Sequence, residues 1–569
     1  MFEVKYRDGM GRLGELQTPH GVIETPTLLP VVNPKKLTLS VNELEECGAT
    51  SLITNSYLIW KEEEFRERAT KEGVHGLLDW DKPIMTDSGT FQAYMYGEVE
   101  VLPEEIIEFQ KKIGTDIGTM LDVFTIPKTN FSDAEKELEE TDKRMKVAAE
   151  MKGEMALNGT IQGGLHMDLR SRAAKMASEL DVDVHPIGGV VPLMEKYEFS
   201  SLVDIVMNVK MNLIAARPVH LFGCGHPMLF PLAALMGCDL FDSASYAKFA
   251  ADDRLMFPWG TRKLADLYEM PSCSLASTGL TINEIKKMED KERVHILAKH
   301  NLLTSFSEIR RVKQAIREGS LWELVELRSH CHPNLMKAME KLREYREYLS
   351  KYEPMFRKRG FSVVSEKSPD RPIVHLISKR IPKSDECFVH PLFGSTPRSL
   401  SQTQPVAQLP NFEGGRTMEW NEERIVEVID FQFGKGLGKK ILGRNIECIF
   451  SEKTGRLRNI NRNGRHILSL RPREGRFTLK KEGAIELHKQ TKYPSNRVVV
   501  EEETAEFNKE GKSVFCQFVL DVDKDLRPMD ECLIVTEKDE LVAFGQLRVS
   551  PCEIEQKQRG YAVRVSEGM

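Results

Sequence analysis

The pattern that most restricts the fold is a short apolar run ending in a polar or Gly-rich turn, which recurs seven times between residues 50 and 246. The runs are TSLITNS (50–56), KPIMTDSGTF (82–91), IGTMLDVFT (117–125), ALNGTIQGG (156–164), VHPIGGVVP (184–192), PVHLFGCG (218–225) and CDLFDSASY (238–246). Apolar residues at helical spacing lie between several of them, at 104–113, 133–151, 169–180 and 199–212. Strands that alternate with helices build a parallel sheet, and about 250 residues of this pattern fit a closed (β/α)8 TIM barrel better than an open sheet.

The rest of the chain predicts smaller domains around this barrel. Residues 3–30 alternate in short runs broken by turns, which indicates hairpins, and short strands after residue 495 indicate a compact all-β domain. Residues 360–420 contain many Pro, Ser and Gln, which is typical of a boundary or an irregular small domain. We predict an α/β chain with a barrel domain at 1–350, a small α+β linker domain at 351–430, a basic domain at 431–494 and an all-β domain at 495–569.

Composition and charge exclude several classes of protein. The chain is 41% hydrophobic and 29% charged, which is typical of folded globular proteins and unlike collagen-like or disordered chains. It has no run of about 18 apolar residues and no apolar signal core near its start, so we expect no membrane span and no secretion, and predict a cytoplasmic protein. The segment 431–500 holds 17 basic and 5 acidic residues, which suits either a solvated surface or one that follows a nucleic-acid backbone.

The candidate site residues stand where the predicted strands end. In a barrel of this kind the chemistry lies at the carboxyl ends of the strands, which here carry Asp87, Asp122, Gln162, Gly188, Gly189 and Asp242. A single carboxylate at a strand end is often only the cap of the next helix. Two carboxylates that face each other across a sugar, however, are the minimum for displacing a group at an anomeric carbon, and Asp87 and Asp242 are the candidates.

Several of these motifs together resemble a known family. TDSGTFQ (86–92), MLDVFT (120–125), TIQGG (160–164), IGGVVPL (187–193) and GCDLFDSASYAKFAADDR (237–254) are similar to the archaeal branch of the tRNA-guanine transglycosylases. HPLFGS (390–395), FQFGKG (431–436), GKSVFCQFV, RPMDECLIV and FGQLRVS resemble the domains appended in that branch, the last of which is a PUA domain. The resemblance therefore covers nearly the whole chain and assigns tRNA binding to the basic domain.

The resemblance implies base exchange on tRNA. Guanine at position 15 of the D-arm would be replaced by 7-cyano-7-deazaguanine, on the way to archaeosine, without a nucleotide cofactor. In the family, the position of Asp242 is the nucleophile that forms a covalent ribosyl intermediate, and that of Asp87 is the general acid/base. The sequence assigns the pair to catalysis but leaves open which of the two acids has which role.

The remaining strand-end residues fit a purine pocket. Asp122 would accept hydrogen bonds from N1 and N2 of the base, Gln162 would donate to O6, and Gly188 with Gly189 would allow close approach of the backbone. Phe91 would stack on the ring, and Ser88, beside Asp87 in the same motif, is predicted to contact substrate. Because the target base lies in a folded tRNA, it must be extruded, so a second surface has to hold the RNA.

The chain departs from the family at its structural zinc. The family's C-x-C-x-x-C and later His align with Ser272, Ser274, Ser277 and His300. Serine hydroxyls are poor zinc ligands at neutral pH, and we predict that this site binds no metal. The cluster His330–Cys331–His332 is an alternative ligand source, although it reads more simply as polar residues at a helix end.

Two other functions stay open. The archaeosine synthases resemble these transglycosylases and convert the nitrile on already modified tRNA, but their P-C-x-x-K-P-Y motif is missing, since Pro551 and Cys552 are followed by Glu-Ile-Glu. A non-catalytic tRNA-binding subunit is disfavoured because Asp87, Asp122 and Asp242 are all present. The expected partners are tRNA, guanine and 7-cyano-7-deazaguanine, and a homodimer is one option because homologous barrels often pair.

Overall fold

The computed structural model describes residues 2–90, 101–271, 275, 278–357, 359–408, 419–556 and 559–569. The chain forms two compact units. Unit 1 comprises Met1–Arg317 and Leu324–Leu342, and unit 2 comprises Glu318–Glu323 and Arg343–Met569. The finer division at residues 350, 430 and 494 stays a prediction.

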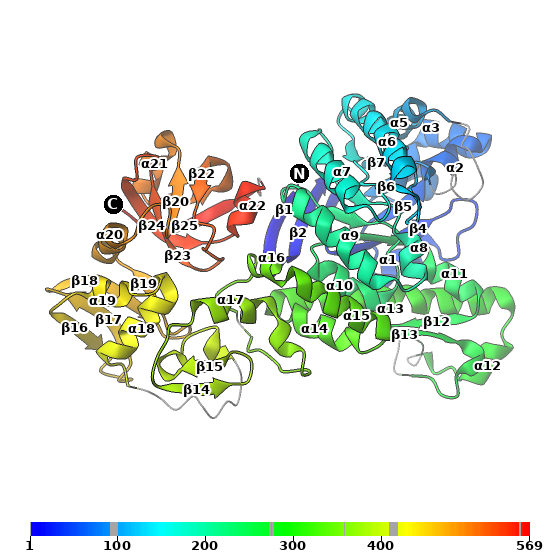
Figure 1. Cartoon of the computed structure of the whole chain (residues 1–569). Helices are drawn as coiled ribbons and strands as arrows, with labels where there is room; N and C mark the ends of the chain where they lie inside the picture. Colours follow the sequence, from blue (N-terminus) through cyan, green and yellow to red (C-terminus); the bar gives the residue numbers. More distant parts are fainter. Residues whose placement is uncertain are drawn as a thin grey trace. The chain divides into compact units, whose positions relative to one another are not determined.

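Unit 1 is built on an eight-stranded parallel sheet with the order β8-β7-β6-β5-β4-β11-β10-β9 (Figure 1). Its strands are β4 (Thr27–Val32), β5 (Leu52–Asn55), β6 (Ile84–Asp87), β7 (Ile117–Thr119), β8 (Ala156–Asn158), β9 (His185–Ile187), β10 (Val219–Leu221) and β11 (Leu240–Ser243). Parallel bridges Asn158↔Val184 and Ile161↔Ile187 join the two ends of the sheet. The predicted barrel is thereby confirmed, with its seam between β8 and β9.

The strand missing from the predicted set of seven is β4, which the sequence places inside the hairpin segment. β4 contains Pro30, and a proline argues against a central strand because it cannot donate to the ladder. The structure nevertheless pairs β4 in parallel with both β11 and β5. The hairpins themselves end earlier, in the antiparallel sheet of β1 (Phe2–Asp8), β2 (Gly11–Thr18) and β3 (Gly21–Thr25).

The β1–β3 sheet closes one end of the barrel. Its apolar residues Phe2, Leu16 and Ile23 form one buried cluster with residues at the beginnings of the barrel strands, among them Ile117 and Leu240. Burying these side chains removes apolar surface from water, which is the main favourable term in folding. The amino ends of the strands are therefore covered, and the carboxyl ends are left to form the functional rim.

Helices surround the strands, and α6, α7 and α9 pack in sequence along the outside of the barrel (Figure 1). The four helices predicted from apolar spacing are present as α5 (Pro103–Lys112), α6 (Phe131–Met151), α7 (Met167–Glu179) and α9 (Phe199–Asn212). Further helices complete the barrel: α1 (Val41–Cys47), α2 (Ser56–Lys61), α3 (Glu63–Leu78), α8 (Val191–Glu195), α10 (Phe230–Leu235) and α11 (Ser245–Ala251). After them come β12 (Arg254–Phe257), β13 (Gly260–Lys263), α12 (Ile282–Lys287), α13 (Asp290–Glu318), α14 (Leu321–Ser329) and α15 (Pro333–Leu342).

Unit 2 contains small sheets and helices around two apolar cores. Its first part holds α16 (Arg346–Ser350), α17 (Pro372–Arg380), β14 (Cys387–His390), β15 (Gly394–Pro397), α18 (Glu422–Phe433), α19 (Leu437–Leu442), β16 (Ile446–Phe450), β17 (Leu457–Arg462), β18 (Arg465–Arg471), β19 (Arg476–Leu479) and α20 (Lys481–Gln490). The terminal six-stranded sheet consists of β20 (Arg497–Val500), β21 (Val514–Phe515), β22 (Val519–Val522), β23 (Glu531–Val535), β24 (Leu541–Leu547) and β25 (Tyr561–Gly568).

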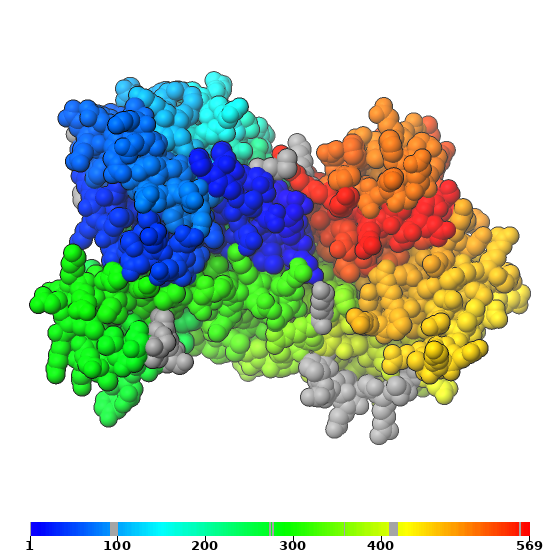
Figure 2. All heavy atoms as spheres, turned by 180° about the vertical axis from the view of Figure 1, so that it is seen from behind, coloured from blue at the N-terminus to red at the C-terminus, as the bar shows by residue number. Residues whose placement is uncertain are grey.

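The terminal domain also carries α21 (Glu502–Lys509) and α22 (Pro551–Glu555), which the strand pattern does not indicate. α22 begins at a capping box in which Ser550 and Glu553 satisfy each other's backbone N–H groups. One apolar core joins this domain to the preceding part of unit 2, because Phe477 of β19 and Phe544 of β24 belong to the same cluster. The yellow and orange-to-red segments accordingly form a continuous surface in Figure 2.

No helix in the described ranges is long and apolar enough to cross a lipid bilayer.

Candidate active site

Three acidic side chains lie at the carboxyl ends of barrel strands. Asp87 is the last residue of β6, Asp242 lies in β11, and Asp122 follows β7 by three residues. They are close enough to interact electrostatically. Burial raises the pKa of Asp87 from 3.8 to about 7, and the negative charges of Asp122 and Asp242 add to this rise. The structure thus brings Asp242 together with Asp87 and Asp122, which lie more than 100 residues before it in the sequence.

Asp87 is held by the neighbouring strand β5. Asn55, paired with Asp87 in the strand register, donates from Nδ2 to Asp87 Oδ2 at 2.9 Å. Ser56 Oγ donates to the Asp87 backbone carbonyl at 2.7 Å. The Asn55 side-chain oxygen also caps α2 by accepting from the Leu58 N–H. One amide therefore positions both the acid and the following helix, a role that the sequence analysis missed although Asn55 ends its own apolar run.

Asp242 is oriented through one of its two carboxylate oxygens. Oδ1 lies 3.0 Å from Nε2 of His220, which is fully buried, and accepts from the Gly223 N–H at 2.8 Å. His220 belongs to β10, the neighbour of β11, and was not predicted as a site residue. The signal for it was a histidine within the apolar run PVHLFGCG, directly before a Gly-rich turn. Both contacts engage Oδ1, so Oδ2 is the carboxylate oxygen that they leave unengaged.

Asp122 and Gln162 form a direct pair, with Gln162 Nε2 donating to Asp122 Oδ2 at 2.6 Å. Both side chains are almost completely buried. Burial raises the pKa of Asp122, and hydrogen bonds from Thr90 and Gln162 partly offset the rise. Gln162 Oε1 is buried and has no hydrogen-bond partner among the described residues. This oxygen is therefore able to accept a hydrogen bond from an N–H group of a ligand.

The Ser88 side chain makes a hydrogen bond within the protein. Its hydroxyl is fully buried and donates to the Met120 carbonyl at 2.8 Å. This bond ties the end of β6 to the segment that leads to Asp122. A contact between Ser88 and substrate stays a prediction, as does stacking by Phe91, which lies outside the described residues.

Gly188 and Gly189 pack directly against Gln162. A Cβ at Gly188 would collide with the Gln162 amide, and one at Gly189 would lie 2.7 Å from the Thr125 carbonyl oxygen. Gly189 also has φ +69°, a left-handed conformation that glycine adopts without strain. The absence of side chains here is therefore required by the packing around the amide that the sequence assigns to the base.

Arg170, in α7, supports this part of the rim from within the protein. Its guanidinium is fully buried and donates to the carbonyls of Ile161, Gly164 and Gly188 at 2.7–3.0 Å. Burial lowers its pKa to about 9. One side chain thus fixes both the TIQGG and the IGG turns. No local sequence pattern predicts this role, because an Arg in an amphipathic helix is usually a surface residue.

The positions aligned with the family's zinc site offer one typical zinc ligand. Ser272, Ser274 and Ser277 lie outside the described residues. His300 is buried on α13, and its Nε2 lies 3.0 Å from the Met256 carbonyl oxygen, to which it donates. Across the described ranges, the groups of three potential ligands do not include His330, Cys331 or His332. With one imidazole and serine hydroxyls, the donor set does not fit structural zinc, and the metal-free state of this loop stays a prediction.

The basic segment 431–500 is less cationic on its surface than its composition suggests. Arg476 and Arg497 are buried and pair with Asp530 and Asp539. Arg462, Arg465 and Arg471 also make ion pairs with acidic residues of unit 2. Several of the counted charges therefore stabilise unit 2. Within the described ranges, Arg456, Arg458, Arg473, Lys480 and Lys481 make no ion pair and fit a phosphate-binding surface better.

Comparison with known proteins gives three matches along the chain. Residues 8–334 match the family described as queuine tRNA-ribosyltransferase. Residues 423–494 match the patch-forming domain C2 of tRNA-guanine transglycosylase, and residues 496–569 match the PUA domain.

Curated relatives match over the full length. A tRNA-guanine(15) transglycosylase of Thermococcus onnurineus is 45% identical over 100% of this chain and 99% of its own. Proteins of the same name from Methanococcus aeolicus and Thermoplasma acidophilum are 39% and 38% identical, again over 100% of this chain and at least 99% of theirs.

Proposed function

The chain belongs to the tRNA-guanine transglycosylase family and is a transferase with a PUA domain, and we propose that it exchanges guanine 15 of tRNA for 7-cyano-7-deazaguanine. The observation that carries the proposal is the group of Asp87, Asp122 and Asp242 at one rim of the barrel, with a pKa of about 7 on Asp87. A carboxyl group that titrates near neutral pH is suited to both giving and taking a proton. Cytoplasmic location and a homodimer stay expectations.

The two acids at the sugar have different surroundings, which suggests different roles. Asp242 is oriented through Oδ1 by His220 and Gly223, so we assign attack on C1′ of the ribose to Oδ2. In the first step the bond from Oδ2 to C1′ forms, the bond from C1′ to guanine N9 breaks, and Asp87 gives its proton to the leaving base. Asp87 is then a carboxylate, ready for the second step.

In the second step the incoming base returns the ribose to RNA. The Asp87 carboxylate takes the N9 proton of 7-cyano-7-deazaguanine, N9 attacks C1′, and the bond to Asp242 breaks. Two displacements at the same carbon retain the anomeric configuration. The enzyme ends with Asp87 protonated and Asp242 ionised, as at the start, so no cofactor is consumed.

The base would lie against Asp122, Gln162 and Gly188. In the present arrangement Gln162 donates an N–H to Asp122, and its Oε1 has no donor among the described residues. A base that brings N1–H and N2–H groups would supply hydrogen bonds to Asp122 and to this oxygen. Donation from Gln162 to O6, the role expected from the family, would require the amide to rotate when the base binds.

The test is exchange of radiolabelled guanine into unmodified tRNA, followed by displacement with unlabelled 7-cyano-7-deazaguanine. We expect D242N to lose at least roughly 10⁴-fold in rate, because the nucleophile is gone, and D87N to lose about 10²–10⁴-fold. The matched control is D252N, an exposed acid after α11, which should retain full activity. Full activity of D242N or D87N would exclude the assigned roles.

A denaturing gel of acid-quenched reactions tests the covalent step directly. Labelled tRNA should migrate with the wild-type protein and with D252N, and the D242N variant should form no such adduct. If the parent protein binds tRNA but exchanges no base, the non-catalytic subunit is the better assignment. If it converts the nitrile of tRNA that already carries the deazaguanine, the synthase is the better one.

A further inference from the structure

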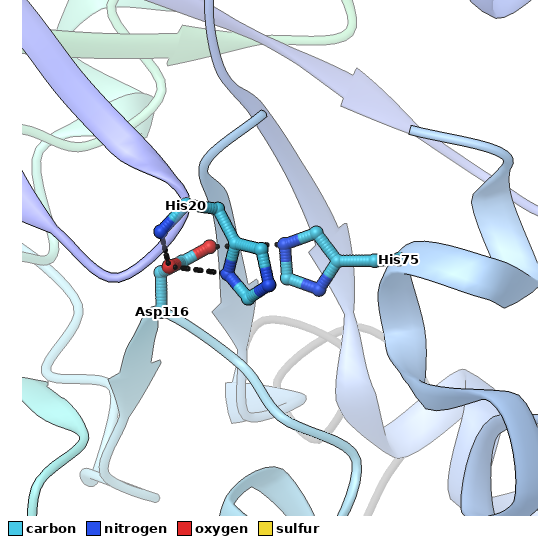
Figure 3. A group of neighbouring side chains, drawn as sticks. All are labelled: His20, His75 and Asp116. Carbon is cyan, nitrogen blue, oxygen red and sulfur yellow. Dashed lines mark hydrogen bonds and ion pairs between the residues drawn. The ribbon is translucent and has the colours of Figure 1, made fainter. Parts of the chain in front are cut away.

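A second group of side chains able to bind a ligand lies at the other end of the barrel. His20 lies in the turn between β2 and β3, His75 lies in α3, and Asp116 directly precedes β7. Figure 3 shows the three side chains pointing toward one another. Their candidate ligand atoms all lie within 4.8 Å of one another. We propose that His20, His75 and Asp116 bind one divalent transition-metal ion, with Zn²⁺ as the best match.

The donor types and spacing support a tetrahedral ion. His20 Nδ1 lies 2.9 Å from Asp116 Oδ1, and His75 Nε2 lies 3.1 Å from Asp116 Oδ2. Zinc binds imidazole nitrogen and carboxylate oxygen at about 2.0–2.2 Å, so the three atoms are close enough to share one ion once the imidazole rings rotate toward it. His20 is 42% exposed. An ion can therefore enter from solvent, and water can occupy the fourth position.

The carboxylate is already held by the backbone. Asp116 is fully buried and accepts from the Ile84 N–H at 2.8 Å and from the His20 N–H at 3.1 Å. Hydrogen bonds from His75, Ile84 and His20 lower its pKa despite the opposing effect of burial. Bonds of this kind to a ligating carboxylate are the outer contacts that orient metal ligands in known sites.

Metal binding would replace the two hydrogen bonds that the imidazoles donate to Asp116. Without the ion, each imidazole donates its N–H to Asp116; with it, each presents a lone pair, and its proton resides on the other ring nitrogen. The imidazole rings already stack, with centroids 3.7 Å apart and planes 25° from parallel. Because imidazole lone pairs lie in the ring planes, the two rings would have to turn out of this stack for both nitrogens to face one ion.

The site connects three elements that are distant in sequence: the β2–β3 turn, α3 and the start of β7. An ion there would link the β1–β3 sheet to the amino-terminal end of the barrel. This is the end of the strands opposite the rim. We expect the ion to raise stability without taking part in exchange. The site is also distinct from positions 272, 274, 277 and 300, where the family resemblance places zinc.

The test uses the full-length chain, stripped with a chelator and titrated calorimetrically with ZnCl₂. We expect one Zn²⁺ per chain, and at least roughly tenfold weaker binding in both H20Q and H75Q, because each loses one ligand. H295Q is the matched control: His295 is 41% exposed and lies 2.8 Å from a Glu43 oxygen, without a second histidine in the group. It should bind Zn²⁺ like the parent.

Thermal unfolding provides a second readout. At the same Zn²⁺ concentration, the unfolding midpoint of the parent and of H295Q should rise more than that of H20Q and H75Q. Co²⁺ should give a visible tetrahedral spectrum in the same two proteins. Absence of stoichiometric binding in the parent, or unchanged affinity in H20Q and H75Q, would overturn the proposal. Neither result would bear on base exchange, which is measured separately.

Discussion

Two buried aspartates flank strand β7, and their pKa values are shifted in opposite directions. Asp116 precedes the strand at the base, and Asp122 follows it at the rim. Both are almost completely buried, yet the pKa of Asp116 is lowered and that of Asp122 is raised. Burial opposes ionisation at both places, so the difference comes from the hydrogen-bond donors around each carboxylate.

Asp239, in the loop before β11, and Asp242, in β11, differ in their hydrogen-bond partners. At the base, both oxygens of Asp239 accept from Arg12, at 2.8 and 2.7 Å, and Oδ2 also accepts from the Val219 N–H. At the rim, the carboxylate Asp242 adds its negative charge to the environment of Asp87. Acidic residues at the amino-terminal end of the barrel have enough hydrogen-bond donors, whereas the acidic residues at the rim lie close enough to destabilise one another. Such an arrangement is typical of active sites.

Removing an acidic residue at the amino-terminal end of the barrel should therefore lower the free energy of unfolding far more than removing one at the rim. We expect D239A to lower the free energy of unfolding by about 3–5 kcal/mol, because Arg12 would remain buried without its carboxylate. Chemical denaturation measures the change. As a control, E72A removes the partner of the exposed Arg68 and should change stability by less than about 0.5 kcal/mol. Similar losses in D239A and E72A would show that the buried Arg12–Asp239 pair contributes no more to stability than an exposed pair does.

Adding a side-chain atom at Gly188 should mainly weaken binding of the purine base. In G188A the new Cβ would collide with the Gln162 amide, and overpacking of this kind costs about 1–3 kcal/mol, or roughly 5- to 150-fold in KM for the base. Steady-state exchange kinetics measure this effect. The matched variant G118A introduces a Cβ against the flexible end of Met155 instead, so KM should stay unchanged. An unaltered KM in G188A would show that the glycine does not shape the pocket.

The pH dependence of exchange should report the acid at the rim. If free enzyme must carry the proton on Asp87, kcat/KM for tRNA falls about tenfold per pH unit above its pKa of about 7. Initial rates between pH 6 and 9 measure this slope. The D87N variant should retain its residual rate without that decline. A wild-type profile that stays level up to pH 9 would assign the proton to another group.

The smallest expected effect is the gain in folding stability when the Asp87 charge at the rim is removed. The pKa of Asp87 is about 7 in the folded chain against an ordinary value of 3.8, so the folded state binds its proton more tightly and loses stability as pH rises from about 4 to 7. D87N, which has no charge to bury, should be more stable than the parent by on the order of 1 kcal/mol at pH 8. The gain should vanish near pH 4, as thermal unfolding at both pH values would show.

Much of the fold was predictable because it follows local periodicity. Seven apolar runs ending in turns identified seven of the barrel strands, and apolar spacing identified α5, α6, α7 and α9. The eighth strand, β4, was hidden because Pro30 breaks the local rule while the strand's neighbours β5 and β11 still pair with it. The short helices α21 and α22 were missed for a related reason: their few residues follow strands directly and give little periodicity.

The candidate site likewise contains residues that local sequence patterns predict and residues that they do not. Residues at strand ends, such as Asp87, Asp122 and Asp242, could be proposed from sequence because parallel strands bring their carboxyl ends to one rim. Residues that act through those side chains were missed: His220 and Asn55 lie in the neighbouring strands, and Arg170 donates from inside a helix. Their partners are set by strand register and helix packing, which no local pattern encodes.

The linear order of residues was enough to establish a barrel chain, its family motifs and the acids at its rim, because periodicity and motif spacing are local properties. Only the folded chain decided which acids meet donors and which meet one another. That difference sets the pKa of Asp87 near 7 and lowers that of Asp116. It also brought His20 and His75 to the same carboxylate, since the β2–β3 turn and α3 approach β7 only after the barrel base has closed.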